Sequence, residues 1–594
     1  MKININIFLS PKIIISLIII YPLLFIWQGL DFSDTGYFLS CYQQVFNDPE
    51  SISGIMPSWL TNIIGGVWVL LFGDSLGLLG VNLAGVIVTY VTIWLSYLIL
   101  KPYIEKRILL IGLLLTVIFA KWFYLLSYYN LTPLFLIASA FFMINGLRNN
   151  KIWQIAISGL IVGFSILIRY PNILGLFLIL SIILFGVLNK TKIKIQVIQL
   201  VSFIFGYIVS VLLTLFAIKI IGIYDFVISS FKEIFFAISD VSGQHGANSL
   251  MKIFYMECLK VVTFATIAIT FILLMPKVLN KFKNRYVYYG FIIIPIILAT
   301  IFYALVLWNG FHINHFIVFL VISVLYAILL LYIVNIEKSS NEFRVVTFIT
   351  LLVLTITPIG SSSGLFTAIN AMWLAFPIAF AYIVSLKELK IELKTIKNTN
   401  SSHFSFSLDG KETLLIKKIV IILIVIFSLL SSFIYTLRDV PNRFEMRYSV
   451  NNQRLKGIFT NKERARVVQE LLDEMSNYVK EDDYLLAYEA ISTLYFLTKT
   501  RPYLYNSQPL FYRPFELRKY LDKAIKERPY LPVIVRAKGS VWDPKWPVES
   551  RMIRPDERNT GNRGILEEFI KINGYSLVWE NDFFEILLPA KNEK

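Results

Sequence analysis

Long apolar runs dominate the first three quarters of the chain. Between residues 11 and 436 such runs recur, separated by short polar segments that carry most of the nearby Lys and Arg residues. A helix of roughly 20 residues crosses the hydrocarbon core of a bilayer at about 1.5 Å per residue. A membrane β-barrel would instead show short strands of alternating polarity. The pattern therefore predicts a polytopic α-helical membrane protein.

The basic residues between the runs predict its orientation, because Lys and Arg concentrate in cytoplasmic loops. Lys2 and Lys12 precede the first run and place the N-terminus in the cytoplasm. The first run is too long for a cleaved signal peptide and is interpreted as an anchor. Thirteen spans follow, which leave the C-terminus outside: 12–30, 76–100, 108–126, 131–147, 152–168, 172–188, 197–221, 256–275, 287–307, 316–334, 345–359, 371–386 and 419–436.

Residues 1–436 are thus the predicted membrane domain, with three longer connections. The first outer loop covers 31–75, and its residues 57–73 are expected to form a short helix on or in the outer interface. A second outer loop covers 222–254. The Lys- and Ser/Asn-rich linker 387–418 is expected to be a cytoplasmic loop.

Residues 437–594 differ sharply from the rest, because they are polar with nearly balanced acids and bases. Their apolar positions alternate between helical and strand periods, which is typical of an α/β domain with a largely parallel sheet. Thr460 and Glu463 are spaced as a capping box before the first helix of this domain. We expect the domain to lie on the extracytoplasmic side, as a structural or acceptor-docking module.

Composition supports the prediction of a membrane protein and argues against nucleic-acid binding, a disulfide framework and a zinc site. Of the 594 residues, 56% are hydrophobic and 16% are charged, against about 25% charged in soluble proteins. The formal charge of +17 does not indicate nucleic-acid binding, because the basic residues lie in the loops. The two cysteines, Cys41 and Cys258, cannot build a disulfide framework or a zinc site.

Two acids stand directly after the first span, in the segment GLDFSDTGYFLS. Asp31 and Asp34 are three residues apart, so a helical turn would place both carboxylates on one side. Such acids are often helix caps or solvated loop residues. Here they lie at the expected membrane surface beside aromatic residues, which makes them candidate functional residues.

Four short motifs stand out in the first 190 residues. They are Asp34-Thr35-Gly36-Tyr37, Pro57 before a short apolar helix, Leu71–Ser75 at the head of the second span, and Gly163–Pro171. Together they resemble the motifs of GT-C glycosyltransferases, in the branch with the protein O-mannosyltransferases and the aminoarabinose transferase of lipid A. The 13-span layout with a C-terminal outer domain is similar to theirs as well.

The resemblance implies transfer of a sugar from a polyprenyl phosphate to a glycan, lipid or protein acceptor on the outer face. It implies that the acid of the first outer loop is catalytic, which by position is Asp34, with Asp31 as a possible helper. A carboxylate within hydrogen-bond reach can take the proton of the acceptor hydroxyl as the new bond forms. One direct displacement would invert the anomeric carbon.

The leaving group is a lipid phosphate, so cations or hydrogen-bond donors must stabilise its charge. The candidates near the outer face are Arg169, His245, Lys252, His312 and His315. A snorkelling role for Arg169 and interfacial structural roles for the histidines remain alternatives. A divalent metal beside Asp34 stays open, but the sequence has no HxxxH or HExxH spacing, so no tightly bound metal is expected.

Two further segments concern the charge of the donor sugar and the pocket that would bind it. Relatives often carry a basic residue before the proline of the interfacial helix, whereas this chain has Met56. A charged donor sugar is therefore disfavoured. The segment 360–364, GSSSG, is either a flexible turn or part of the donor pocket.

Two other functional classes remain as alternatives. A transporter or flippase of lipid-linked sugars would need charged residues deep in its spans, and the runs are almost purely apolar. A non-catalytic envelope scaffold would not need Asp34. The prediction is a multi-pass glycosyltransferase of the bacterial cytoplasmic membrane.

Overall fold

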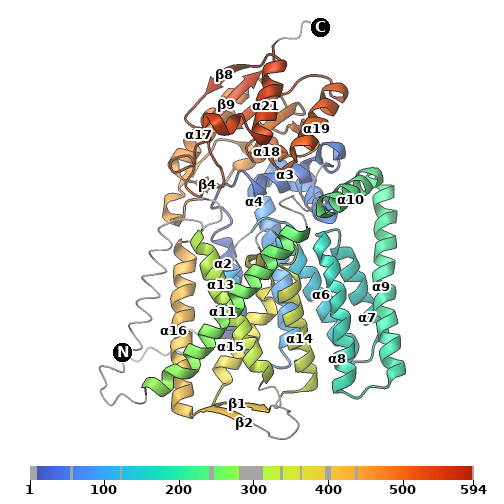
Figure 1. Cartoon of the computed structure of the whole chain (residues 1–594), viewed down its shortest axis with the longest axis vertical. Helices are drawn as coiled ribbons and strands as arrows, with labels where there is room; N and C mark the ends of the chain where they lie inside the picture. The colour runs from blue at the N-terminus through green and yellow to red at the C-terminus, as the bar shows by residue number, and fades with distance from the viewer. Residues whose placement is uncertain are drawn as a thin grey trace.

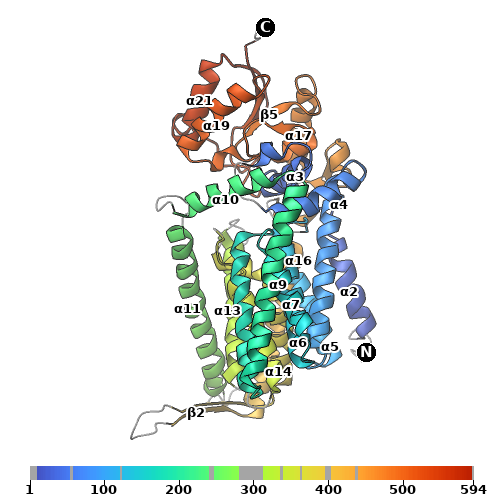
Figure 2. The same ribbon diagram turned by 90° about the vertical axis from the view of Figure 1, so that its right-hand side faces the viewer.

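A helical bundle carries a mixed α/β unit on one end in the computed structural model of the chain (Figures 1 and 2). The structure describes residues 10–53, 58–120, 124–239, 247–279, 312–334, 339–361, 364–394, 403–434 and 439–590. The α/β unit, residues 439–590, lies at what we call the sheet end of the bundle. A small β-hairpin lies at the opposite end.

The bundle is built from apolar helices whose chain order follows the predicted runs. They are α2 (Pro11–Leu23), α4 (Trp59–Leu100), α5 (Lys106–Phe119), α6 (Tyr128–Arg148), α7 (Ile152–Ser165), η2 (Tyr170–Ile179) with α8 (Leu180–Leu188), α9 (Ile193–Ile220), α11 (Ala247–Leu279), α13 (His312–Val334), α14 (Asn341–Ile356), η4 (Gly364–Ala371) with α15 (Met372–Ser385), and α16 (Gly410–Ile434).

Five of the described helices are long and apolar enough to cross a membrane. They cover Trp59–Leu100, Tyr128–Arg148, Tyr170–Leu188, Ile193–Ile220 and Gly364–Ser385. The protein is therefore a multi-pass membrane protein by helix length and composition. The predicted span 287–307 lies outside the described residues, so the count of 13 spans stays a prediction.

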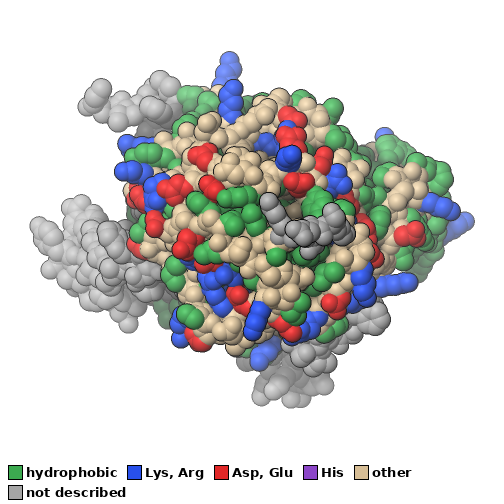
Figure 3. Space-filling view, turned by 90° about the horizontal axis from the view of Figure 1, so that it is seen from above, with side chains coloured by type: hydrophobic (Ala, Val, Ile, Leu, Met, Phe, Trp, Pro, Cys, Tyr) green, Lys and Arg blue, Asp and Glu red, His purple; other side chains and the backbone are tan. Residues whose placement is uncertain are grey.

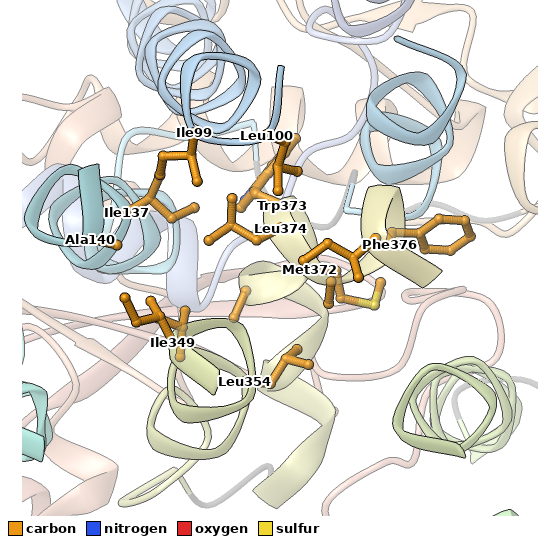
Figure 4. Close-up of a cluster of buried hydrophobic side chains, with 14 of the residues drawn as sticks. Ile99, Leu100, Ile137, Ala140, Ile349, Leu354, Met372, Trp373, Leu374 and Phe376 are labelled. Atoms are coloured by element: carbon orange, nitrogen blue, oxygen red, sulfur yellow. The ribbon is translucent and has the colours of Figure 1, made fainter. Parts of the chain in front are cut away.

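The bundle core is formed where α15 packs against α4, α5, α6 and α14. Figure 4 shows Trp373 and Leu374 pointing among Leu100, Ile137 and Ile349. These side chains are apolar throughout, and Met372, Leu374 and Ile137 are at most 1% exposed. Close packing of this kind holds the sheet ends of the helices, and the loops on them, in a fixed arrangement.

One glycine separates the predicted interfacial helix from the second span. Residues 59–100 form one helical run with non-helical backbone at Gly77, where φ is +51°. A Cβ there would lie 2.2 Å from the carbonyl oxygen of Arg454. Only glycine combines that φ with so close an approach. The two predicted helices are therefore two halves of α4, bent where the α/β unit rests on it.

Two segments predicted as loops contain regular structure. Within 222–254, α10 (Tyr224–Ser239) lies across the sheet end of the bundle (Figure 2) and precedes the start of α11. Within 387–418, β1 (Leu389–Lys394) pairs antiparallel with β2 (His403–Leu408), and α16 already begins at Gly410. The predicted cytoplasmic loop 387–418 thus contains a hairpin, and alternating polarity in these short stretches is typical of strands. Its side of the membrane stays a prediction.

The α/β unit has a five-stranded sheet in the order β6-β5-β7-β9-β8. Its elements are β3 (Tyr448–Ser449), β4 (Phe459–Thr460), α17 (Lys462–Met475), β5 (Tyr484–Tyr488), α18 (Thr493–Leu497), β6 (Arg501–Pro502), α19 (Pro514–Glu527), β7 (Val533–Ala537), α20 (Pro555–Arg558), α21 (Gly561–Ile572), β8 (Ser576–Glu580) and β9 (Phe584–Leu588).

The sheet is mixed and not largely parallel. β5 is parallel to both β6 and β7, whereas β9 is antiparallel to β7 and to β8. The reason lies in the connections, because helices link β5, β6 and β7 while only three residues join β8 to β9. So short a link permits only an antiparallel pair.

Polar residues cover the outward surface of this unit, while its two cores lie on either side of the sheet. Seen from above, Lys and Arg side chains alternate with Asp and Glu over that surface (Figure 3). Such mixed charge suits contact with water. One sheet side packs on α19 and α21, and the other packs on α17, α18 and the first loop of the bundle.

The predicted capping box at Thr460 and Glu463 was wrong by one residue. Asn461 is the N-cap of α17, and its side chain accepts from the backbone N–H of Arg464. The Thr460 hydroxyl instead donates to Asp439, at 2.7 Å. The helix therefore begins one residue later than predicted, because the Asn461 side chain supplies the oxygen that accepts from the first turn.

Candidate functional site

The first loop after α2 forms a short helix, α3 (Asp34–Gln44), between the bundle and the α/β unit (Figure 1). Every residue from Leu30 to Val45 is buried except Asp34 and Tyr37, which are partly exposed. These two are three positions apart and therefore share one side of the helix. We call it the Asp34 face. It is the accessible surface of an otherwise enclosed element.

Asp31 does not lie on the Asp34 face. Its carboxylate instead accepts hydrogen bonds from groups at the start of α3. It accepts hydrogen bonds from the Ser33 backbone N–H at 3.0 Å, the Ser33 hydroxyl at 2.8 Å and the Thr35 backbone N–H at 2.8 Å. Donors at a helix start lack partners within the helix, and Asp31 supplies them. With 6% exposure, its role is to position the loop that carries Asp34.

Other phenol side chains lie near Tyr37 of the Asp34 face. Burial raises the pKa of Tyr37 well above its usual value, and the neighbouring Cys41, Tyr128 and Tyr170 raise it further. The phenol hydroxyl is therefore a neutral hydrogen-bond donor at physiological pH. The Tyr170 ring stacks on Phe231 of α10 with 4.5 Å between ring centroids, and its buried hydroxyl has no hydrogen-bond partner.

Arg169 lies beside these phenols, at the junction of α7 and η2. Its guanidinium donates to the carbonyls of Thr357 at 2.6 Å and Ile359 at 3.1 Å, just beyond α14. It also lies 5.9 Å from the centroid of the Tyr128 ring. These two bonds use two of its five N–H donors. They fix the direction of the cation and tie three parts of the bundle together.

The GSSSG segment adjoins the same arginine. A Cβ on Gly360, where φ is +76°, would lie 2.5 Å from Pro171 and 4.0 Å from a guanidinium nitrogen of Arg169. Its Ser362 and Ser363 are outside the described residues. The two motifs 163–171 and 360–364 are thus neighbours in space, which sequence separation alone did not indicate.

The other predicted cations are less closely placed. Lys252 lies exposed on the second turn of α11. His245 is outside the described residues, and so are the side chains of His312 and His315, although α13 begins at His312. Met56 is likewise outside them. None of these is brought to Asp34 by a described contact.

The α/β unit closes over the first loop through its own backbone and side chains. The Thr493 hydroxyl donates to the Asp31 carbonyl at 2.8 Å, and the Thr493 N–H donates to the Phe32 carbonyl at 3.1 Å. The Gln508 amide donates to the Ser33 carbonyl at 3.0 Å. Sequence reasoning missed these residues, because nothing in their spacing shows what they contact.

Gly36 shows how close this contact is. A Cβ at position 36 would lie 2.0 Å from the Thr493 nitrogen and 2.5 Å from the Ser492 carbonyl carbon. Real Cβ contacts are never so short, so glycine is required for this approach. The motif Asp34–Tyr37 therefore includes a residue that brings the α/β unit against the candidate site.

A small pocket lies within the bundle, between α4, α6 and η4 with α15. Its lining mixes hydroxyl and amide side chains with aromatic rings: Thr89, Thr92, Ala120, Tyr129, Asn130, Pro133, Asn370 and Trp373. The Tyr129 ring also lies 6.4 Å from Phe38 of α3. Tyr129 therefore links the pocket to the surroundings of α3, although none of the lining residues belongs to that helix.

No three His, Cys, Asp or Glu side chains gather into a metal-binding group within the described parts of the chain. The histidine side chains at 245, 312 and 315 fall outside that search. The possibility of a divalent ion beside Asp34 therefore stays untested.

Comparison with known proteins finds a similarity for one part of the bundle. No curated protein matches the chain. Residues 53–214 match the family described as dolichyl-phosphate-mannose-protein mannosyltransferase. The match extends from α4 into α9 and includes Arg169, whereas Asp34 and the α/β unit lie outside it. Residues 53–214 of this membrane protein are therefore similar to the dolichyl-phosphate-mannose-protein mannosyltransferase family, which is of GT-C type.

Proposed function

We propose that the protein transfers a sugar from a polyprenyl-phosphate donor to an acceptor hydroxyl, at the sheet end of the bundle, with inversion and with Asp34 as general base. The family match supports a membrane glycosyltransferase that uses a lipid-phosphate sugar. The observation that carries the assignment to Asp34 is the Asp34 face, the partly exposed side of a helix that is otherwise buried.

The proposed reaction is a single displacement. The acceptor oxygen forms a bond to the anomeric carbon while its proton passes to the Asp34 carboxylate. The bond from that carbon to the phosphate oxygen breaks, and the polyprenyl phosphate leaves with the electron pair. Attack and departure on opposite sides of the carbon invert its configuration.

Arg169 is the proposed partner of the phosphate. It lies at the edge of the phenol cluster around Tyr37, and its two bonds to Thr357 and Ile359 hold its orientation in advance. A cation fixed before the reaction stabilises the growing charge without reorganising. His245, Lys252, His312 and His315 remain secondary candidates for this role.

The proposed location is the cytoplasmic membrane of a bacterium, with the sheet end outside. The separation of the α/β unit from the β1–β2 hairpin at the opposite end supports two distinct aqueous sides (Figure 1). Reporters fused after Lys594 and at Lys397 should then report opposite sides of the membrane. Two reporters on the same side would contradict the 13-span orientation.

Transfer by the purified chain is the direct test. Wild-type protein in lipid nanodiscs is mixed with radiolabelled polyprenyl-phosphate mannose and an extract of cell-envelope glycans, lipids and proteins. Label should move to one acceptor class, and Asp34→Asn should stop it. A flippase would instead move labelled donor across proteoliposomes without making product. A scaffold would do neither and would be unaffected by Asp34→Asn.

A further inference from the structure

Helix α11 carries an ion pair within its predicted membrane span. The Lys260 ammonium lies 2.8 Å from the Glu257 carboxylate, and both residues belong to the predicted span 256–275. Ionisable residues inside a span are rare and mark functional sites more often than others do. The bases of α9, Lys194 and Lys219, lie instead near the two ends of that helix. A pair inside α11 is therefore a feature that the helix does not need in order to cross a membrane.

The acid of this pair lies on the inner side of α11. The Glu257 side chain is 13% exposed, and Phe254 and Val261, about one turn before and after it, are partly or fully buried as well. A Cβ on Gly364, where φ is +55°, would lie 2.8 Å from the Glu257 Cγ. Glycine suits both this backbone conformation and the close approach of the acid. Glu257 thus packs against the last residue of the GSSSG segment.

The GSSSG segment connects the surroundings of Glu257 with those of Arg169. Its first residue, Gly360, adjoins the Arg169 guanidinium. The Gly364 N–H donates to the Ser361 carbonyl at 3.0 Å, and a turn of this kind keeps the Cα atoms of the two residues within about 7 Å. Glu257 and Arg169 therefore lie at opposite ends of one compact segment.

The cation of the pair lies on the outer side of α11, which runs along the outside of the bundle in both views (Figures 1 and 2). The Lys260 side chain is 52% exposed, and Lys252 is exposed about two turns nearer the sheet end. Because Glu257 precedes Lys260 by one turn, their contact directs the ammonium toward the sheet end, as in snorkelling lysines. Exposed apolar side chains accompany the two cations. We call the whole set the α11 flank: Met251, Lys252, Tyr255, Met256, Leu259, Lys260 and Val262.

We propose that the α11 flank is the docking surface for the donor, where Lys252 and Lys260 bind the phosphate of the polyprenyl-phosphate sugar before it reaches Arg169. This deepens the proposed function and rests on it for the word donor. Lysines at a membrane surface attract anionic headgroups, and the helix has a single acid, Glu257, which lies on its inner side. The exposed apolar side chains of the flank contact the hydrocarbon chain of the donor.

Glu257 keeps Lys260 paired while the flank is empty. An ammonium without a counter-charge is costly in hydrocarbon, and the 2.8 Å contact with the carboxylate lowers that cost. An incoming phosphate then competes with the carboxylate for the same ammonium. Since Glu257 also packs against Gly364, this exchange of partners takes place beside the segment that adjoins Arg169.

Donor binding by charge-changing variants tests the proposal. The full chain in phosphatidylcholine nanodiscs is titrated with labelled polyprenyl-phosphate mannose, with no acceptor present. Lys252→Gln and Lys260→Gln should each weaken binding about 5-fold, the effect of one cation fewer near a membrane surface. Glu257→Gln should strengthen binding, because the neutral amide competes less for Lys260. Lys219→Gln, which removes an exposed lysine at the sheet end of α9, is the matched control and should bind normally.

A purely structural ion pair gives a different pattern. In that case Lys260→Gln and Glu257→Gln should both unfold at a lower temperature, and neither should change the donor affinity. Unchanged donor affinity in both variants, weaker binding by both, or equal weakening by Lys219→Gln would overturn the proposal.

Anionic phospholipid distinguishes the donor from other lipid phosphates. The titrations are repeated in nanodiscs that contain phosphatidylglycerol, and wild type should still bind the donor more tightly than Lys260→Gln. If phosphatidylglycerol removes that difference, the α11 flank binds phospholipid headgroups and the proposal is wrong.

The two proposals can fail separately. Donor binding that depends on Lys252 and Lys260, without transfer to any acceptor, would remove the proposed reaction and keep the docking surface. Transfer with an unchanged donor KM in the Lys252→Gln and Lys260→Gln variants would keep the reaction and remove the docking surface.

Discussion

Asp439 and Arg464 form an ion pair of 3.1 Å in which neither side chain is exposed. The Asp439 carboxylate also accepts from the Leu30 N–H at 2.8 Å, and Arg464 donates to the Leu30 carbonyl at 3.1 Å. The pair therefore holds the residue that begins the first loop, four positions before Asp34. The α/β unit and the candidate site share one buried network.

Removing one member of this pair should destabilise the protein strongly. Arg464→Ala leaves Asp439 as a buried charge without its partner, at a cost of about 3–5 kcal/mol. Arg466→Ala, two residues along α17, removes three ion pairs of a side chain that is 41% exposed and should cost about 0–1 kcal/mol. Thermal unfolding of both variants in nanodiscs measures the difference. Equal effects would contradict a special role for the buried pair.

Asp34→Asn should lower turnover by roughly 10²- to 10⁴-fold, because the amide cannot accept the proton. Its unfolding temperature should change little, since Asp34 is on the partly exposed side of α3. Asp31→Asn should lower stability as well as turnover, because a neutral amide binds its three donors less strongly. Sugar transfer and thermal unfolding are measured on the same preparations. Wild-type turnover in Asp34→Asn would remove the proposed base.

Arg169 distinguishes phosphate binding from a purely structural role. Arg169→Ala should weaken donor binding and turnover, whereas Arg169→Lys should keep part of both, because it keeps the charge but loses the planar fork. Donor binding is measured with labelled polyprenyl-phosphate mannose. If both variants bind donor normally and only unfold earlier, the bonds to Thr357 and Ile359 are the whole role of Arg169.

Gly36→Ala should separate the α/β unit from α3. The new methyl group would overlap the backbone of Thr493 and Ser492, and overpacking of this kind costs about 1–3 kcal/mol. Turnover should fall together with stability. Gly410→Ala is the control, because a Cβ there would meet only the Lys387 carbonyl at an ordinary 3.8 Å. A stable, fully active Gly36→Ala protein would show that the contact is not required.

Acidification should lower the stability of the folded α/β unit, because Glu585 becomes protonated. Burial alone would raise the pKa of Glu585, but the charges and hydrogen bonds of Arg536 and Arg558 outweigh it, so its pKa lies below the usual value. A depressed carboxyl pKa stabilises the folded state above the unfolded pKa of about 4.3. That stability is lost as pH falls through the folded pKa.

The unfolding temperature of the wild type should therefore fall more steeply between pH 5 and pH 3, a range set by that carboxyl pKa of about 4.3, than that of Glu585→Gln. The variant should be less stable at pH 7 and show a smaller change on acidification. Parallel curves for the two proteins would show that Glu585 does not contribute to the acid sensitivity.

Periodicity predicted the helices of the bundle well, because burial in lipid or core demands continuous apolar runs. It also predicted β5, β7 and the β8–β9 pair. It could not predict the mixed sheet order, which depends on contacts between distant segments. Periodicity could not predict the kink at Gly77 either, because the kink depends on a contact with the distant Arg454 carbonyl.

The candidate site was only partly readable from the sequence. The spacing of Asp31 and Asp34 indicated that both carboxylates lie on one side of a helix. In the structure Asp31 caps the start of α3, whereas Asp34 lies on its partly exposed side. Arg169 was found as a cation beside aromatic residues, but its carbonyl partners lie 188 and 190 residues away. Thr493 and Gln508 carry no motif at all, because ordinary polar residues become informative only through their contacts.

The bond from Gln508 to Ser33 joins residues 475 positions apart, and this has a consequence for synthesis. At about 5–20 residues per second, a ribosome needs about 25 to 95 s to travel between them. During that time the first loop has left the ribosome without the residues that enclose it. The candidate site therefore forms late in the production of the molecule, and a truncated product should hold Asp34 in a helix without its cover.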